Sequence, residues 1–172
     1  MNGSAPAKVR VLAIDPGTVV AGFGVLEASG EDASLLECGC IRPPSRAEAS
    51  VKLLRIFREV TRLLRTHRPD ILALEDVFYH KNVRSTLKLG EVRGICSLAA
   101  ARAGIRVISY SPRAVKKAVV GNGAADKTQV QRMVAVLLGL TSLPEPLDVS
   151  DALALGLACL QDIRFRALVE KS

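Results

Sequence analysis

Apolar and polar positions follow two periods along the chain, which predict strands first and an alternation of strands and helices later. Early apolar runs are short and separated by turn signals, such as Pro16-Gly17 after the first run. Residues 47–66 instead repeat apolar positions near helical spacing, with arginines between them. Gly104 is a helix stop signal. The expected strands are residues 9–15, 23–27, 35–41, 71–76 and 106–110, and the expected helices are residues 47–66, 85–103, 112–120, 125–138 and 149–165.

Three early strands followed by strand–helix alternation predict an α/β fold, with a mixed central sheet flanked by helices. The chain has 172 residues, enough for one sizeable core and too few for two full domains. Neither an internal repeat nor a linker interrupts the pattern. We therefore expect residues 1–172 to form a single domain, with a core of about residues 9–166.

Four acidic residues stand beside apolar runs, where a carboxylate is costly to desolvate. Asp15 ends the first run, Glu75 ends the run 71–74, and Asp148 and Asp151 begin the apolar stretch 152–160. If the four converge, each pair about 4 Å apart repels by roughly 4 kcal/mol at an effective dielectric near 20. Stability does not favour such an arrangement, but a pair of divalent cations would neutralise it and supply nuclease chemistry.

Each acid also has a plain structural interpretation when it is taken alone. Asp15 before Pro16-Gly17 is compatible with an ordinary turn, and Glu75 with the polar end of a strand. Asp148, three residues before Asp151, fits a helix N-cap with an acid in the first turn. An N-cap role and metal ligation are compatible for Asp148.

Charge and composition narrow the class of partner. Lysine and arginine outnumber aspartate and glutamate by 24 to 17, which favours a polyanion, nucleic acid before membrane. No leader-like apolar segment occupies residues 1–8, and the stretch 152–160 is shorter than the roughly 20 residues of a membrane span, so we expect a cytoplasmic location and no membrane contact. The four cysteines lack C-x-x-C spacing, which predicts small buried thiols and no disulfide framework.

Five local strings, taken in order, resemble the ribonuclease H-like nuclease fold and, more narrowly, the RuvC-type Holliday junction resolvases. The resemblance spans about residues 9–163. One string alone is weak, but five in the same order are specific. The strings are AIDPGT at 13–18, LEDVFYHKN at 74–82, LKLG at 87–90, VVGNGAADK at 119–127 and DVSDALA at 148–154.

The resemblance implies phosphodiester hydrolysis with two Mg²⁺ or Mn²⁺ ions per subunit, because hard oxygen ligands suit these ions. It assigns Asp15 to bridge both ions and Glu75 to ligate one. Asp148 and Asp151, on one helix face, would close the site. Asp151 occupies a position where some relatives carry histidine, which leaves the metal preference open.

The same resemblance assigns DNA contacts. It places Phe78 at the exchange point of the junction, stacked on an unpaired base, and Lys116 and Lys127 near the scissile phosphate. A core role for Phe78 and solvated surface positions for the lysines are the alternatives. Only 3% of the chain is aromatic, so the Phe78-Tyr79 pair is conspicuous. The full set of expected DNA-binding residues is Phe78, Tyr79, Lys81, Arg84, Lys88, Lys116, Lys117 and Lys127, of which Lys116 and Lys127 also count as catalytic.

Taken together, these expectations describe an endonuclease that resolves four-way DNA junctions by symmetric paired nicks, in homologous recombination and DNA repair. The resemblance implies a homodimer, with the helix 85–103 as candidate dimer surface, and hand-over from the RuvA and RuvB branch-migration proteins. Three other classes remain: an actin-like ATPase, for which the chain is about half the needed size; a non-enzymatic junction-binding module; and another nuclease of the same fold.

Overall fold

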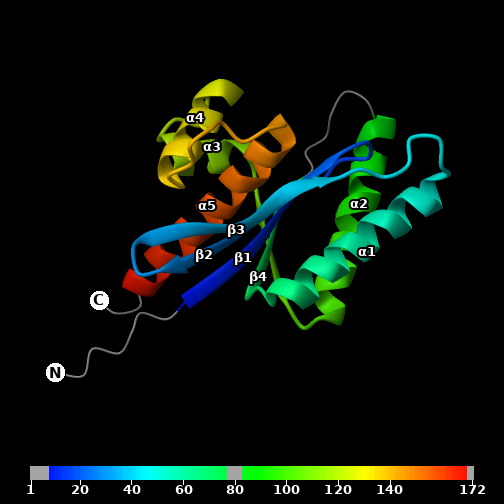
Figure 1. Cartoon of the computed structure of the whole chain (residues 1–172), viewed down its shortest axis with the longest axis horizontal. Coiled ribbons are helices and arrows are strands. Elements are labelled where there is room, and N and C mark those ends of the chain that lie inside the picture. Colours follow the sequence, from blue (N-terminus) through cyan, green and yellow to red (C-terminus); the bar gives the residue numbers. More distant parts are fainter. Residues whose placement is uncertain (1–7, 77–82, 170–172) are drawn as a thin grey trace.

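The computed structural model describes residues 8–76 and 83–169, which form one five-stranded sheet with helices on both faces (Figure 1). The strand order across the sheet is β3-β2-β1-β4-β5. The strands are β1 (Lys8–Asp15), β2 (Ala21–Ser29), β3 (Asp32–Ile41), β4 (Ile71–Glu75) and β5 (Arg106–Tyr110). The helices are α1 (Ala49–His67), α2 (Val83–Arg102), α3 (Pro112–Val120), α4 (Lys127–Leu137) and α5 (Leu147–Val169).

The sheet is mixed, as the sequence predicts. Strands β1, β2 and β3 form an antiparallel meander, whose tight turns suffice for antiparallel neighbours. Strand β4 pairs with β1 in parallel, and β5 pairs with β4 in parallel. A parallel pair needs a crossover connection, and helix α2 supplies the one between β4 and β5. The carboxyl ends of β1, β4 and β5 consequently lie at the same edge of the sheet.

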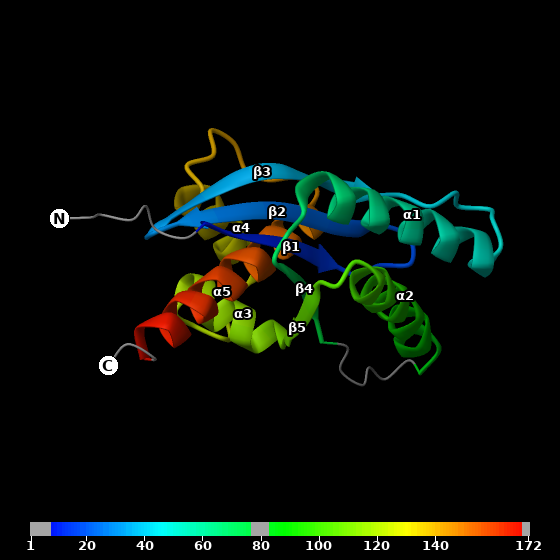
Figure 2. The same ribbon diagram turned by 90° about the horizontal axis from the view of Figure 1, so that it is seen from below.

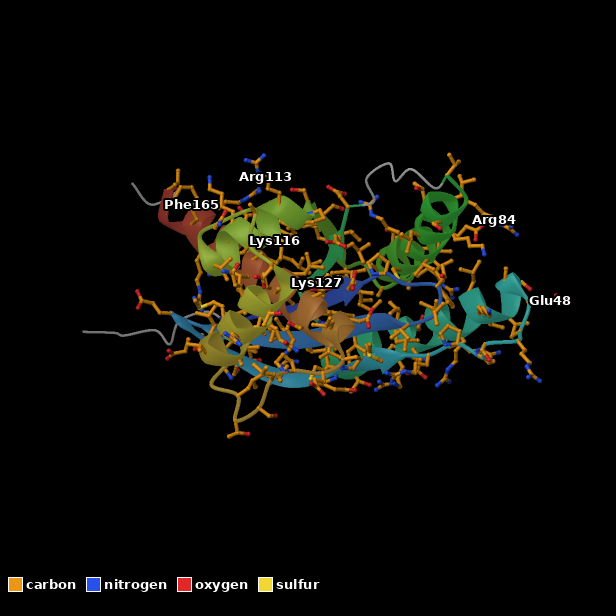
Figure 3. All side chains as sticks on the ribbon, turned by 90° about the horizontal axis from the view of Figure 1, so that it is seen from above. Glu48, Arg84, Arg113, Lys116, Lys127 and Phe165 are labelled. Carbon is orange, nitrogen blue, oxygen red and sulfur yellow. The ribbon has the colours of Figure 1, made fainter. Side chains whose placement is uncertain are left out.

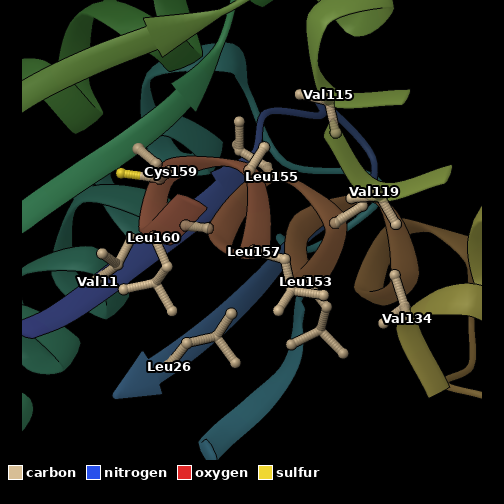
Figure 4. Close-up of a cluster of buried hydrophobic side chains, with 14 of the residues drawn as sticks. Val11, Leu26, Val115, Val119, Val134, Leu153, Leu155, Leu157, Cys159 and Leu160 are labelled. Carbon is tan, nitrogen blue, oxygen red and sulfur yellow. The ribbon is translucent and has the colours of Figure 1, made fainter. Parts of the chain in front are cut away.

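Each face of the sheet has its own hydrophobic core. Helices α3, α4 and α5 cover one face, and α1 and α2 cover the other (Figure 2). Helix α5 packs across β1 and β2 and is buried continuously over residues 152–160 (Figure 4). Helix α1 buries only one stripe, which is typical of a helix with one solvent-facing side. The face under α5 is therefore the more deeply enclosed one.

The element boundaries differ from the sequence-based expectation mainly at polar ends. Strands β2 and β3 extend to Ser29 and Asp32, which pair with each other in the ladder although neither is apolar. Helix α4 begins at Lys127 because the Asp126 side chain accepts the backbone N–H of Gln129, and the Gln129 side chain accepts that of Asp126. Hydrogen bonds determine where these elements begin and end, and the pattern of apolar positions carries no information about those bonds.

The four cysteines are free thiols, as expected. Cys96 and Cys159 are buried, whereas Cys38 is exposed on strand β3, so the expectation of burial is wrong for Cys38. It lies on the strand at the sheet edge, where one strand partner is missing. Within the described ranges, none of the helices has both the length and the apolar character to cross a membrane.

Candidate active site

Two of the four acids leave adjacent strands at the same edge of the sheet. Ile14 of β1 is in register with Leu74 of β4, so the next residues, Asp15 and Glu75, end neighbouring parallel strands together. Both residues are half-buried. Since a strand fixes the backbone of its last residues, the two carboxylates start from rigid positions.

Helix α5 brings the other two acids to the same place. Asp148 and Asp151 lie in its first turns, three residues apart and hence on one side of the helix. Asp148 lies inside the first turn of α5, which begins at Leu147, so the N-cap interpretation is wrong by two residues. Carboxylates are favourable at a helix N-terminus because the positive end of the helix dipole lies there.

A glycine that the sequence analysis did not single out permits this approach. Gly22 of β2 is in register with Asp15, and a Cβ atom placed on it would lie 1.9 Å from the carbonyl oxygen of Asp148. Any other residue would push the start of α5 away from the sheet. The only sequence signal is that Gly22 and Gly24 interrupt an otherwise apolar strand, which is typical of close backbone approach.

The four acids form one electrostatic cluster centred on Asp15. Burial is the largest cause that raises the pKa of the Asp15 carboxyl, and the negative charges of Glu75, Asp151 and Asp148 add to it in that order of size, so that the pKa reaches about 8. Lys127 acts in the opposite direction. The structure thus brings together all four acids named from the sequence, and leaves their charge only partly compensated.

Lys127 binds directly to one of these acids. Its Nζ donates to Oδ2 of Asp151 at 2.6 Å, and this hydrogen bond raises the pKa of the lysine ammonium. Lys127 is the first residue of α4, whose start is fixed by the capping box described above. A cation on a rigid helix end is therefore held at the rim of the acid cluster.

The cluster opens into a pocket of about 300 Å³. Three of the acids and two lysines line it together with apolar residues, so the pocket presents both signs of charge to a ligand. Its charged lining residues are Asp15, Glu75, Asp151, Lys116 and Lys127. Figure 3 shows Lys116 and Lys127 on neighbouring helices over this part of the molecule.

The other expected DNA contacts are more scattered. Lys117 is exposed on α3, next to Lys116 but outside the lining of the pocket. Arg84 and Lys88 are exposed on the first turns of α2. Figure 3 shows Arg84 well away from Lys116 and Lys127. Lys88 lines a different pocket of about 300 Å³, between α1 and α2. Three expected contacts lie outside the described residues: Phe78, Tyr79 and Lys81.

The donors of the cluster are all carboxylate oxygens, which suit a hard divalent cation such as Mg²⁺ or Mn²⁺. Such an ion would supply the positive charge that a buried Asp15 with three acidic neighbours lacks, so the donor set fits the expected metal. Among the described side chains, no three potential ligands already surround a common point. Asp151, in particular, is directed to Lys127.

Known proteins resemble this chain in sequence and in fold. The family model described as "Crossover junction endodeoxyribonuclease RuvC" matches residues 11–159. The chain belongs to the RuvC family. A curated RuvC from Koribacter versatilis is 48% identical over 155 residues, which cover 88% of this chain and 92% of the relative.

Solved RuvC structures resemble the whole described fold. The Thermus thermophilus RuvC structure matches with a TM-score of 0.85 and 33% identity, covering 91% of this chain and 96% of that one. The structure of T. thermophilus RuvC in complex with a Holliday junction substrate matches with a TM-score of 0.84 and 31% identity, with the same coverage. The expected ribonuclease H-like fold is thereby confirmed for this RuvC-family chain.

Proposed function

We propose that this chain is a structure-selective endonuclease that resolves four-way DNA junctions by paired, symmetric nicks, in homologous recombination and DNA repair. The observation that carries the proposal is the half-buried Asp15 carboxyl, on which the negative charges of Glu75, Asp148 and Asp151 act together. A fold gains no stability from such a cluster, whereas a metal-dependent nuclease requires it. Membership of the RuvC family supports the same activity.

In this proposal the four acids hold two divalent cations, Mg²⁺ or Mn²⁺, in each subunit. The chemistry that bound ions supply at such a site is activation of an attacking water and stabilisation of the leaving 3′-oxygen. Asp15 would be the shared ligand, which is supported by its interaction with all three other acids. Glu75, Asp148 and Asp151 would complete the ligand set from β4 and α5, and Asp151, which contacts Lys127, would be the fourth ligand.

Lys116 and Lys127 act on the phosphate in this scheme. Both line the pocket that the acids open into, and a lysine ammonium there stabilises the charge that develops on the scissile phosphate. Phe78 would stack on an unpaired base near the exchange point, and Tyr79 and Lys81 would contact DNA beside it. Arg84, Lys88 and Lys117 would bind phosphates, which positions the junction without reading its sequence.

A homodimer would let two active sites nick a two-fold symmetric junction. Helix α2 supports the expected dimer surface, because Leu87 and Leu98 are 66% and 55% exposed along it. Gly90 and Gly94 lie between them, and a Cβ on either would meet nothing within 4 Å, so another helix has room to approach. A second copy of the chain, joined through α2, is the occupant that the proposal requires.

Three further expectations, on protein partners, cell compartment and domain organisation, complete the proposal. RuvA and RuvB would deliver the junction, which family membership supports. The cell compartment would be the cytoplasm, which fits a nuclease that acts on DNA. Residues 1–172 would act as one domain with a core of about residues 9–166, which is supported by two hydrophobic cores that share a single sheet.

The experiment that tests the proposal compares nicking of a synthetic four-way junction with nicking of a linear duplex of the same sequence. Each is incubated with Mn²⁺, with Mg²⁺ or with EDTA. Paired nicks confined to the junction and dependent on metal are expected. Equal cutting of both substrates would indicate a general nuclease, and tight junction binding without cutting would indicate a binding module.

Two variants probe the finer assignments. Phe78→Ala should slow junction cleavage with no change in fold, and a wild-type rate would exclude stacking. Leu98→Glu should shift the sedimentation profile from dimer to monomer, because a charge on the apolar face of α2 opposes its burial. A dimer that persists in Leu98→Glu would place the interface elsewhere.

A further inference from the structure

Asp76 follows Glu75 directly, and its carboxylate is held by a helix on the opposite face of the sheet from α5. Nη2 of Arg93, in α2, lies 3.0 Å from Oδ1 of Asp76 and also donates to the hydroxyl of Ser109 in β5. One guanidinium thus joins α2, the end of β4 and β5. Nothing in the resemblance to the RuvC family assigned a role to these residues.

We propose that Arg93 is a positioning residue that fixes the end of β4, and with it the Glu75 carboxylate, for cleavage. The inference rests on the nuclease function proposed above. Glu75 is the last residue of β4, so its side-chain position depends on how firmly the chain is held at the next residue. Arg93 holds that next residue through its side chain.

The backbone of Asp76 is already anchored on one side. Its N–H donates to the carbonyl oxygen of Tyr110 at 2.9 Å, which continues the β4–β5 ladder by one step. That bond alone leaves the side chain of Asp76 free to turn. The contact with Arg93 adds a second anchor from α2, so the strand end is restrained from both the sheet and the helix layer.

Stability is a poor explanation for this contact. The two side chains are 34% and 40% exposed, and ion pairs at such positions contribute little to the free energy of unfolding. The Nε atom of Arg93 is buried without a hydrogen-bond partner in the described structure, which is itself unfavourable. A contact that stabilises the fold so little is better explained by what it positions.

The contact between Arg93 and Asp76 also compensates the negative charge of Asp76. Asp76 would otherwise be a fifth acid beside a cluster that already holds four, and it would compete with Glu75 for a metal ion. Arg93 compensates that charge on the face away from α5. The cluster then keeps a defined number of ligands, all on the side where α5 supplies the other acids.

The test uses the full-length protein and three variants, Arg93→Gln, Asp76→Asn and the double variant. The control is Arg55→Gln, which removes an arginine contact to Glu59 within α1, the helix that shares a face of the sheet with α2. Single-turnover nicking of a four-way junction, junction affinity in EDTA and melting temperature are measured for each. Melting temperature is also titrated with Mn²⁺.

We expect each single variant to slow nicking by about 10- to 100-fold, the usual cost of a misplaced catalytic group. The double variant should be no slower than the slower single variant, because both changes remove one contact. Junction affinity and metal-free melting temperature should match those of Arg55→Gln. More Mn²⁺ should be needed to raise the melting temperature, since Glu75 is the ligand that moves.

Several results would overturn the inference. Wild-type nicking in both single variants would exclude a positioning role, and multiplied losses in the double variant would show that the two residues act separately. A large fall in melting temperature would make Arg93 a structural residue. Failure of the wild type to nick any junction would instead refute the proposed function, and the Mn²⁺ titration would still report on Glu75.

Discussion

Strand β1 carries two cations near its first end, Lys8 and Arg10, and an acid, Asp15, at its last residue, and the carboxyl pKa is shifted in opposite directions at the two ends. Near Arg10, Glu27 accepts hydrogen bonds from Arg10 at 2.6 Å and from Lys8 at 2.9 Å, and these bonds lower the pKa of its carboxyl. At the other end, burial and three acidic neighbours raise the pKa of Asp15. Cations of β1 therefore compensate one acid, Glu27 of β2, whereas the acid at the other end of β1, Asp15, is only partly compensated.

The compensated end extends into the neighbouring strand and helix. Glu37 of β3 contacts His67 at 2.5 Å and Arg62 at 3.2 Å, both from α1, and the bond to His67 lowers the pKa of the carboxyl most. Acids there hold the sheet to α1. The comparison teaches that the fold readily compensates an acid at one end of the sheet, so the raised pKa of Asp15 is a specific feature of the other end and is explained by function.

Removing the central acid should have the largest effect. Asp15→Asn keeps the size of the side chain and deletes its charge, so nicking should fall by at least about a thousandfold because the shared metal ligand is lost. The melting temperature in EDTA should rise, since a buried carboxylate among acids is replaced by a neutral amide. Gel-based junction nicking and thermal melting measure the two effects.

The companion variant is Glu27→Gln at the compensated end, which should leave nicking unchanged. Junction binding by Asp15→Asn in EDTA should stay near the wild-type level. If Asp15→Asn lost binding and melted lower than wild type, Asp15 would be a folding residue and the contrast between the two ends would fail.

Gly22→Ala should displace the acids of α5 without changing any charged residue. A Cβ atom there would lie 1.9 Å from the carbonyl oxygen of Asp148, and backbone on both sides must move to relieve this overlap. We expect a lower melting temperature and a strong loss of nicking, because Asp148 and Asp151 shift with the start of α5. Melting in EDTA and junction nicking at a temperature where the variant is folded measure both.

Gly24→Ala is the matched control two residues along the same strand. Its Cβ would meet the side chain of Leu153 at 2.5 Å, so the overlap falls on side-chain atoms of the core. Overpacking of this kind typically costs about 1–3 kcal/mol of stability. The folded fraction of Gly24→Ala should nick at the wild-type rate, and an equal loss in both variants would remove the special role of Gly22.

The free energy of unfolding should depend on pH through Asp15. In the folded protein the carboxyl holds its proton up to a pKa of about 8, whereas in the unfolded chain it releases the proton near its ordinary pKa of 3.8. Between these values the folded state holds more protons, so its stability in EDTA falls as pH rises, by at most about 1.4 kcal/mol per pH unit. Denaturant titrations from pH 5.5 to pH 8 measure this slope.

Asp15→Asn should flatten that slope, and the difference between the two slopes isolates the one carboxyl. Glu27, Glu37 and Asp162 have lowered pKa values, so they titrate below this window and affect both proteins equally. Stabilisation by Mn²⁺ should grow over the same pH range, because ligands must be deprotonated to bind a metal. Equal slopes in both proteins would show that Asp15 is not buried with a proton.

Much of this architecture could be predicted from the sequence because it depends on local patterns of apolar and acidic residues. Apolar runs give the five strands, and the acids that end two of them give the candidate site, since parallel strands align their carboxyl ends. Asp148 and Asp151 follow from helical spacing. The expectation that these acids lie together therefore needs only the strand order and one helix.

The remaining features depend on contacts between distant segments. No local pattern shows that Gly22 makes room for α5, that Lys127 turns to Asp151, or that Arg93 reaches Asp76. Each joins residues at least 17 positions apart. The packing of the helices on the sheet decides which residues make these contacts. The sequence alone leaves many other possible partners for each of them.

A substitution at the compensated end of β1 should have the smallest effect. Glu27→Gln removes the shared acceptor of Lys8 and Arg10, yet both cations stay solvent-accessible and can bind water instead. We expect the melting temperature to fall by only a few degrees, and the difference from wild type to shrink in high salt because salt screens exposed charges. A fall as large as that of Gly22→Ala would mean that this end of β1 stores stability. The uncompensated acid at the other end would then be tolerated because Glu27 offsets its cost.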